Sequence, residues 1–370
     1  MSGQPSASVR AADTPSTGVE ADARSPQERF LGLSRRRQFT LIEELLLTRS
    51  DELLRAYPCL LAVGHGFRRR RKHARDGVGE IVTAERCVLF LVRKKWKRRG
   101  SQLRRLPAHL YCHDLIRGRR TLLAIPTDVS ESLPLQANAS PEAVDVAERV
   151  AHGVLTCLVD CTLADGTRER RALSCRHVLS LTGIRSPEPD SVPVRHNGAL
   201  IGDTLAIRGE LSATDPAGFD AQAMRVSTPP AANRCVFSAI WPRGYVSYAG
   251  EFEASMWLQL PRDDGAIRVN YRGVWPVMRV SYGSGAARFV ASVGPLVEVE
   301  LVGNQKTLPG DSGSPLVIGY SKPRLAGMHI AGNPDDGNGR ALSYCIPAYA
   351  LMDPGNYAGA DGEQWTLPRN

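Results

Sequence analysis

A six-residue turn near the C-terminal end constrains this 370-residue chain more than any other feature. Its sequence is GDSGSP at residues 310–315, which places Ser312 between two glycines. Glycine adopts backbone conformations that other residues avoid, so the turn can aim the amides of Gly310 and Ser312 at one oxyanion. A serine hydroxyl is a poor nucleophile unless an imidazole takes its proton and a carboxylate orients that imidazole. The fold must therefore bring a histidine and a carboxylate to Ser312.

Two upstream residues are the candidates for these roles. His177 lies in the segment ALSCRHV, and Asp220 begins the alternating apolar segment FDAQAMRV. The order His, Asp, Ser differs from that of α/β-hydrolases and subtilisins. Asp203 and Asp215 are competing carboxylates, although Asp203 follows a glycine in a pair typical of turns. Taken alone, a histidine is more often a packed or surface residue than a base.

Composition excludes several other classes of protein. No run approaches the ~20 consecutive apolar residues of a membrane span. Residues 1–25 lack the apolar centre of a secretory signal, so we expect a cytoplasmic protein. The cysteines lack the spacing of a zinc site, and we expect reduced thiols, no metal and no cofactor. These cysteines are Cys59, Cys87, Cys112, Cys157, Cys161, Cys175, Cys235 and Cys345, of which Cys157 and Cys161 form one possible pair.

The positive charge is concentrated in the N-terminal third. Residues 1–135 hold 26 Lys and Arg against 14 Asp and Glu, whereas the remainder holds 21 against 24. The densest runs are residues 68–72 and 93–105. Such runs could bind a nucleic-acid backbone or an acidic protein surface. A solvated strand edge kept soluble by its charge is the other interpretation, and we favour it because no nucleic-acid-binding motif accompanies the charge.

The patterning predicts a small α+β domain first. Residues 1–38 are expected to be disordered. Thr40 and Glu43 form a capping box that predicts a helix from about residue 40 to residue 56. Apolar runs at 60–63, 86–92 and 121–125 then predict strands, so that a basic α+β domain spans residues 39–134. A polar stretch with two prolines predicts a linker at 135–149.

From residue 150 onward the pattern of apolar and polar residues changes and predicts short alternating strands. Turns recur about every ten residues, which is typical of an antiparallel barrel or sandwich. The clearest strand is at 297–301, with valines and a leucine on one face and glutamates on the other. We expect two β-barrels over residues 150–352, with a boundary near 235–245, and a tail at 353–370. The predicted fold is thus a mainly β double barrel preceded by a small α+β domain.

The segments ALSCRHV, FDAQAMRV, TLPGDSGSPLV and LAGMHIAG resemble trypsin-like peptidases of the chymotrypsin clan. The resemblance implies a serine endopeptidase with His177, Asp220 and Ser312 as its triad, and with the amides of Gly310 and Ser312 as its oxyanion hole. The phrase IPTDV at 125–129 is similar to the end of the N-terminal domain in the bacterial and plant Narrow Leaf group. The chain departs from that group in the residues before His177, where two asparagines are usual.

A second resemblance concerns the substrate side chain before the scissile bond. Thr307 and the strand GMHIAG, which contains His329, Ile330 and Gly332, are similar to the pocket of picornavirus-type cysteine proteases and of glutamate-specific serine proteases. That likeness implies a preference for Glu or Gln, whose oxygen a hydroxyl and an imidazole can satisfy. Lys306 would favour Glu if it faces the pocket. His329 as an ordinary strand residue with a local partner is the alternative.

Other questions stay open at this stage. Asp311 needs a donor, because no freshly cut N-terminus is evident within the chain. The loop at 333–340 could gate the pocket or be a plain hairpin. The expected partner is a protein or peptide substrate, and an oligomer is possible. A binding protein that keeps the protease fold with little activity, and a protease recruited to nucleic acid by its basic domain, are the alternative functions.

Overall fold

The computed structural model describes residues 24–74, 77–93, 106–131, 135–137, 153–180, 191–196, 199–212, 218–227, 242, 244–253, 255–260, 266–283, 288–303, 305–319, 322–333 and 341–368. Several predicted features lie outside these residues, namely the basic stretch at 94–105, Asp215, Cys235, the linker at 138–149, most of the boundary near 235–245 and the loop at 334–340. In the described part of the chain, no helix is long and apolar enough to cross a membrane.

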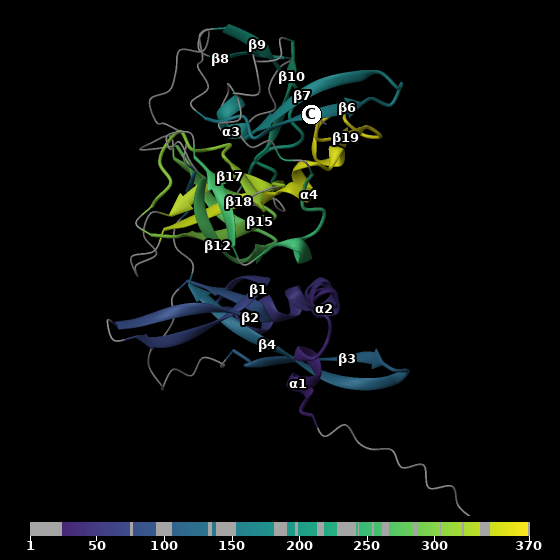
Figure 1. Ribbon diagram of the computed structural model, residues 1–370, viewed down its shortest axis with the longest axis vertical. Helices are drawn as coiled ribbons and strands as arrows, with labels where there is room; N and C mark the ends of the chain where they lie inside the picture. Colours follow the sequence, from purple (N-terminus) through teal and green to yellow (C-terminus); the bar gives the residue numbers. More distant parts are fainter. Residues whose placement is uncertain are drawn as a thin grey trace, which may run out of the picture.

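The N-terminal domain is a small α+β unit at one end of the molecule (Figure 1). Its elements are α1 (Pro26–Leu31), α2 (Arg35–Ala56), β1 (Leu60–Ala74), β2 (Gly77–Val92), β3 (His109–Ile116) and β4 (Arg119–Glu131). β1 pairs with β2, and β4 lies between β2 and β3. Leu41, Ile42 and Leu45 recur at helical spacing on α2 and are buried in a core shared with these strands.

The first helices begin earlier than predicted. Ser34 is the N-cap of α2, because its hydroxyl accepts a hydrogen bond from the amide of Arg37. Thr40 lies inside the helix, where its hydroxyl donates to the carbonyl of Arg36. The predicted capping box at Thr40 was therefore wrong. The prediction of disorder over residues 1–38 was also wrong from residue 24 onward, since α1 and the first turn of α2 are ordered there.

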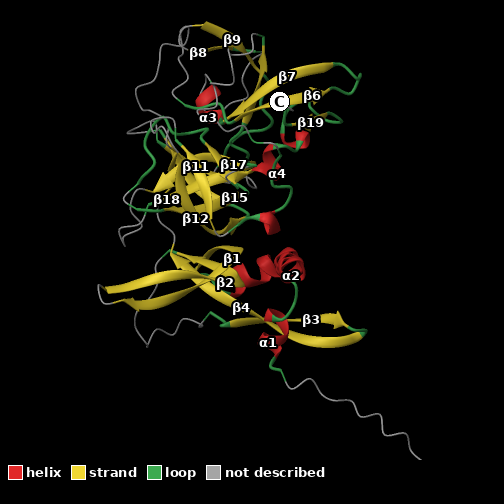
Figure 2. Ribbon diagram, viewed as in Figure 1, coloured by secondary structure: helices red, strands yellow, loops and turns green. Residues whose placement is uncertain are grey.

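Six strands in the C-terminal part close into a barrel, which lies at the middle of the molecule in Figure 2. Around the ring they are β11 (Ser255–Gln259), β12 (Ala266–Trp275), β15 (Leu296–Leu301), β18 (Leu342–Pro347), β17 (Arg324–Asn333) and β16 (Pro315–Ile318), with β16 pairing back to β11. Alternating apolar residues such as Met256, Val269 and Leu316 fill the interior. The short elements η2 (Ala249–Glu251) and α4 (Ala348–Leu351) precede and follow this ring.

Three further strands extend this sheet. β13 (Met278–Tyr282) pairs with β14 (Phe289–Val293) and with β5 (Leu135–Ala137), and β5 also pairs with β17. Residues 135–137 were predicted to belong to a linker, but they are part of the sheet because their backbone is hydrogen-bonded on both sides.

A second six-stranded sheet lies at the other end of the molecule (Figure 1). Its order is β19 (Gln364–Thr366), β6 (Cys157–Thr162), β7 (Arg168–Ser174), β10 (Gln222–Val226), β9 (Ala199–Thr204) and β8 (Pro193–His196), and the short helices α3 (Arg176–Leu179) and η4 (Pro354–Asn356) accompany it. The predicted chymotrypsin-like, mainly β double-barrel fold with a preceding α+β domain is confirmed.

The segment at 353–370, predicted to be a tail, supplies an edge strand of this second sheet. β19 pairs with β6, and Trp365 is buried. The guanidinium of Arg171 lies over the Trp365 ring and donates two hydrogen bonds to Glu363, at 2.7 and 2.9 Å. One buried aromatic residue and one ion pair thus hold in the sheet a segment whose Gly, Asn, Asp and Pro content is typical of a loop.

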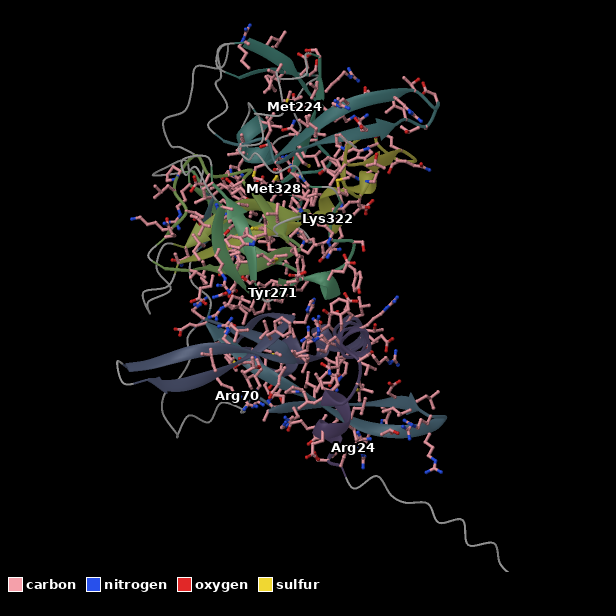
Figure 3. The ribbon with its side chains drawn as sticks, in the orientation of Figure 1. Arg24, Arg70, Met224, Tyr271, Lys322 and Met328 are labelled. Carbon is pink, nitrogen blue, oxygen red and sulfur yellow. The ribbon has the colours of Figure 1, made fainter. Side chains whose placement is uncertain are left out.

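The N-terminal domain is joined to the closed barrel by a continuous sheet. β1 pairs with β12 through Gly66 and Gly273, and a side-chain carbon at Gly66 would come within 2.4 Å of the carbonyl of Arg272. The absence of side chains at this crossing therefore allows the two backbones to meet. Tyr271, labelled in Figure 3, packs against Phe67 of β1 and is fully buried at this junction.

Charged groups are buried at the same junction. Arg69 of β1 approaches Glu298 of β15 at 3.3 Å, and both side chains are less than a tenth exposed. The indole of Trp275 donates a second hydrogen bond to Glu298, at 2.8 Å. The glutamate face of the strand at 297–301 is thus covered at Glu298 by the N-terminal domain.

Much of the described basic run on β1 is neutralised locally. Besides Arg69, both Arg68 and Arg70 form ion pairs with Glu85 on the neighbouring strand β2. This arrangement favours the interpretation of a charged strand edge over that of a phosphate-binding surface for these three residues.

The seven cysteines in the described ranges are free thiols. Cys157 and Cys161 lie on β6 without a bond between them.

Candidate active site

Three predicted residues meet where the two β-sheets face one another. His177 Nδ1 lies 2.7 Å from Asp220 Oδ2, and His177 Nε2 lies 2.8 Å from Ser312 Oγ. His177 and Asp220 come from the sheet of β6–β10, whereas Ser312 comes from the closed barrel. All three side chains are at most 1% exposed. An unbroken hydrogen-bond chain thus joins a buried carboxylate to a serine hydroxyl.

The local backbone fixes the imidazole. β7 ends at Ser174, and the short helix α3 that follows it carries His177. The amide of His177 donates to Asp220 Oδ1 at 3.1 Å, so Asp220 holds both the backbone and the ring of the histidine. Because Nδ1 faces a carboxylate, it carries the proton, which leaves Nε2 as an acceptor for the Ser312 hydroxyl.

Asp203, the competing carboxylate within the described chain, lies elsewhere. It is in β9, where its Cα is opposite Arg225 of β10. Within the described chain, His177 forms its hydrogen bonds with Asp220 and Ser312 and not with Asp203.

Gly310 and Gly313, on either side of Ser312, require glycine for different structural reasons. Both have positive φ, +97° at Gly310 and +94° at Gly313. A side-chain carbon at Gly313 would come within 1.8 Å of the carbonyl of Val154, whereas at Gly310 it would meet no atom within 4 Å. Gly313 therefore permits close packing, and Gly310 provides only the backbone conformation.

The predicted oxyanion donors are the amides of Gly310 and Ser312. Neighbouring amides of the same loop are engaged, since Asp311 donates to the carbonyl of Leu308 and Gly313 to that of His329. No described residue accepts a hydrogen bond from the amide of Gly310 or Ser312. These two N–H groups are thus free of an acceptor within the described chain, as the predicted role requires.

Asp311 holds the shape of this loop. Its carboxylate accepts a hydrogen bond from the amide of Leu308 at 2.7 Å, and the residue is 2% exposed. The loop therefore has a donor for this aspartate from its own backbone, which answers the question that the sequence left open.

The segment before β6 is hydrogen-bonded to the loop at 310–315 that carries Ser312. The amide of Val154 donates to the carbonyl of Ser312 at 2.8 Å, and the hydroxyl of Thr156 donates to the carbonyl of Gly313 at 2.7 Å. Ser174 in turn donates to the carbonyl of Val154. Ser312 is thus positioned by contacts from both sheets.

Sequence reasoning missed Tyr282. This residue ends β13, and its hydroxyl donates to Asp220 Oδ2 at 2.9 Å. Its ring lies 5.6 Å from that of His177 and is stacked on Phe289. Burial and the neighbouring Asp220 raise the pKa of Tyr282 well above its ordinary value, so the phenol keeps its proton and remains a donor.

The predicted pocket residues fall into two groups. Thr307 and His329 are buried, and His329 Nδ1 lies 2.8 Å from the hydroxyl of Ser343 on β18. The Thr307 hydroxyl oxygen has no hydrogen-bond partner among the described residues. An unsatisfied buried hydroxyl costs free energy, which makes Thr307 a candidate donor to a ligand.

The other pocket candidates have different environments. Ile330 and Gly332 are buried on β17, and the carbonyl of Ile330 lies 3.4 Å from Ser312 Oγ. Lys306 is exposed. Its side chain therefore belongs to the surface and does not line a buried wall.

Cys175 lies beside this site as a protonated thiol. Cys175 is fully buried, its thiol donates to the carbonyl of His329, and burial raises its pKa well above the ordinary value, so it is not a nucleophilic thiolate. In the parts of the chain described, no group of three or more His, Cys, Asp and Glu residues is arranged to hold a metal ion.

Comparison with solved structures finds serine and viral proteases. A glutamic-acid-specific serine protease, described as using a histidine triad in substrate binding, is 12% identical over 55% of this chain and 96% of that chain, with a TM-score of 0.32. Cellulomonas bogoriensis chymotrypsin is 12% identical over 59% and 98%, with a TM-score of 0.33. The NS6 protease of murine norovirus 1 is 14% identical over 57% and 97%, with a TM-score of 0.28. No protein-family model and no curated protein matches the chain.

Proposed function

We propose that this protein is a serine endopeptidase. The observation that carries the proposal is the hydrogen-bond chain from Asp220 through His177 to Ser312, with distances of 2.7 and 2.8 Å. A buried serine hydroxyl can be held by chance, but an imidazole with a carboxylate on one nitrogen and a serine on the other is the arrangement that activates a nucleophile.

In the proposed reaction, Ser312 Oγ attacks the carbonyl carbon of the scissile peptide bond. His177 Nε2 takes the hydroxyl proton and then gives it to the leaving amine as the C–N bond breaks. Water, deprotonated by His177, then releases the acyl group from Ser312. Asp220 stays ionised and stabilises the imidazolium, while the amides of Gly310 and Ser312 bind the oxyanion.

We further propose that Glu or Gln is preferred before the scissile bond. Thr307 supports this preference, because its buried hydroxyl oxygen lacks a partner in the described chain. His329 supports it as well, because the Ser343 hydroxyl holds its ring from the Nδ1 side. Two such groups suit a side-chain carboxylate or amide oxygen. Lys306 is exposed, so the proposal does not depend on it.

Substitution of the nucleophile tests this function. The wild type should cleave a library of peptides that present each residue before the scissile bond, and Ser312→Ala should cleave none while keeping the circular dichroism spectrum of the wild type. Labelling of Ser312 by a fluorophosphonate probe provides a second readout, because it requires an activated serine and no knowledge of the substrate. Turnover retained by Ser312→Ala would contradict the assignment.

Two finer predictions accompany the proposal. Kinship with the Narrow Leaf group depends on the phrase at 125–129 and on the order of the domains. A cytoplasmic location is the second of these predictions. Fractionation of the producing cells would test the location.

A further inference from the structure

We propose that the N-terminal domain holds a binding site for a small, multiply charged phosphate compound. The site is a cavity of about 900 Å³ between α1 and the hairpin of β3 and β4. Its volume is within the range of small-molecule pockets, and the cavity is open to solvent, since Arg117, Arg119 and Arg120 are exposed. It lies at the end of the molecule opposite the sheet that carries His177, where Arg24 is labelled in Figure 3.

The lining has one sign of charge. Half of the ten described lining residues are arginines, and none is Asp or Glu; the arginines are Arg24, Arg29, Arg117, Arg119 and Arg120. Leu33, Ile116 and Leu122 add apolar surface to the wall. Arginine presents a planar fork that matches phosphate oxygens two at a time, and apolar surface next to it accommodates an uncharged part of a ligand.

Two carboxylates on the elements that form the cavity have other partners. Asp114 lies opposite the lining residue Thr121 in the β3–β4 register, but its carboxylate is bound by the guanidinium of Arg37 and by the amide of Leu115. The hydrogen bond from Arg37 lowers the pKa of Asp114. Glu28 of α1 closes a capping box with Ser25. Within the described chain, Arg117, Arg119 and Arg120 take part in no ion pair.

The turn between β3 and β4 has an unusual backbone conformation at an arginine. Arg117 and Gly118 connect Ile116 to Arg119, and both turn residues have positive φ, +51° and +74°. Asn, Asp and Gly suit the first position of such a turn, and a longer side chain there is uncommon. A strained conformation is retained where the surrounding structure gains from it, and here it places a guanidinium at the cavity.

The cavity is built on a fixed frame. Phe30 anchors α1 in the domain core, being fully buried, and the Gln27 side chain lies 3.0 Å from His109 Nε2 on β3. The side-chain Nε2 of Gln38 donates to the carbonyls of Leu31 and Leu33 at the end of α1. Because these contacts hold both walls, little ordering is needed when an anion binds.

The test measures the binding of sodium tripolyphosphate to the full-length protein by titration calorimetry. We expect one site with a dissociation constant of roughly 10–100 µM at low salt, weakening as salt is added. The double variant Arg119→Ala/Arg120→Ala should weaken binding at least roughly tenfold. The variant Arg119→Lys/Arg120→Lys should lose a smaller part of the affinity, because lysine keeps the positive charge but lacks the planar guanidinium. Arg168→Ala, an exposed arginine at the start of β7, is the control and should bind as the wild type does.

Arg117→Asn separates binding from folding. Asn suits the turn, so this variant should melt at or above the temperature of the wild type, while its dissociation constant for tripolyphosphate rises severalfold. No binding up to millimolar tripolyphosphate, or equal dissociation constants for the wild type and Arg119→Ala/Arg120→Ala, would overturn the proposal.

A fluorescein-labelled 12-nucleotide single strand tests the other source of phosphate. If the strand binds through these arginines and tripolyphosphate fails to displace it, the site is a nucleic-acid surface and the small-ligand proposal is overturned. The proposal is supported if tripolyphosphate displaces the strand at concentrations near the dissociation constant that calorimetry gives for tripolyphosphate. Peptidase activity does not enter either measurement, so failure of this proposal is distinct from failure of the proposed function.

Discussion

Tyr282 and Asp220 are joined by a hydrogen bond of 2.9 Å across the two β-sheets. The same Asp220 oxygen accepts the Nδ1 proton of His177, so one carboxylate atom is held by donors from both halves of the double barrel. The stacking of Tyr282 on Phe289 fixes the direction from which its hydroxyl approaches. Tyr282 is therefore a positioning residue for the imidazole.

Tyr282→Phe should lower kcat about tenfold and leave KM unchanged. The reason is that a hydrogen bond to a charged group contributes about 1.5–3 kcal/mol, whereas Tyr282 is placed to touch the aspartate and not the substrate. Steady-state kinetics on the best peptide substrate measure both constants. Tyr248→Phe, which changes a partly exposed tyrosine outside the site, should behave as the wild type; a rise in KM alone for Tyr282→Phe would contradict the role.

Thr307→Val should lower kcat/KM on Glu and Gln peptides by roughly tenfold or more without destabilising the protein. Valine has the shape of threonine, and it removes a buried oxygen that lacks a partner in the described chain, so the free energy of unfolding should stay equal or rise. Peptide profiling and urea denaturation measure the two effects. His329→Ala should lose the same selectivity, and an unchanged profile in both variants would remove the proposed pocket.

Arg69→Ala should lower the free energy of unfolding by about 3 kcal/mol. Among the described residues, the change would leave the buried Glu298 carboxylate with Trp275 as its donor. Arg70→Ala is a matched control, because the Arg70 side chain is 57% exposed and its pair with Glu85 should contribute under about 1 kcal/mol. Urea denaturation followed by tryptophan fluorescence compares them, and equal effects would show that Glu298 does not depend on Arg69.

Acidification should destabilise the junction through His65. Burial, with a smaller effect of Arg86, lowers the pKa of His65 to about 3. The folded state therefore keeps this imidazole neutral while the unfolded chain gains a proton below about pH 6.5, so the stability contributed by His65 is full above that pH and is lost as the pH falls toward 3. Between pH 7 and pH 5 the wild type should lose about 2 kcal/mol more than His65→Gln in thermal unfolding, and parallel pH curves would contradict the burial of a neutral ring.

The candidate site could be predicted to the extent that its chemistry is local. A serine between glycines and a histidine in a suitable segment carry recognisable sequence signals, and the structure brings Ser312, His177 and Asp220 within hydrogen-bond distance. Tyr282 carried no such signal. It is 62 residues from Asp220 and ends a strand with ordinary alternation, so only the packing of the two sheets reveals its role.

The sequence predicts the helices and strands whose apolar residues recur with a regular period. It does not predict the elements that depend on a single tertiary contact. The alternating strands of the closed barrel and the apolar face of α2 follow their patterns. The start of α2 was missed because Ser34 and Thr40 are both capable N-caps, and tertiary packing decides between them. The last strand was missed because Trp365 is buried within a segment of turn-forming residues.

The pairing of β1 with β12 at Gly66 and Gly273 fixes the N-terminal domain relative to the closed barrel. Because β1 and β12 belong to one sheet there, a ligand or partner held by the N-terminal domain keeps a constant position relative to Ser312. A protease on a flexible tether can sample many bonds of a captured protein. For the proposed peptidase, the distance between a site bound by the N-terminal domain and the cleaved bond would then contribute to the choice of substrate.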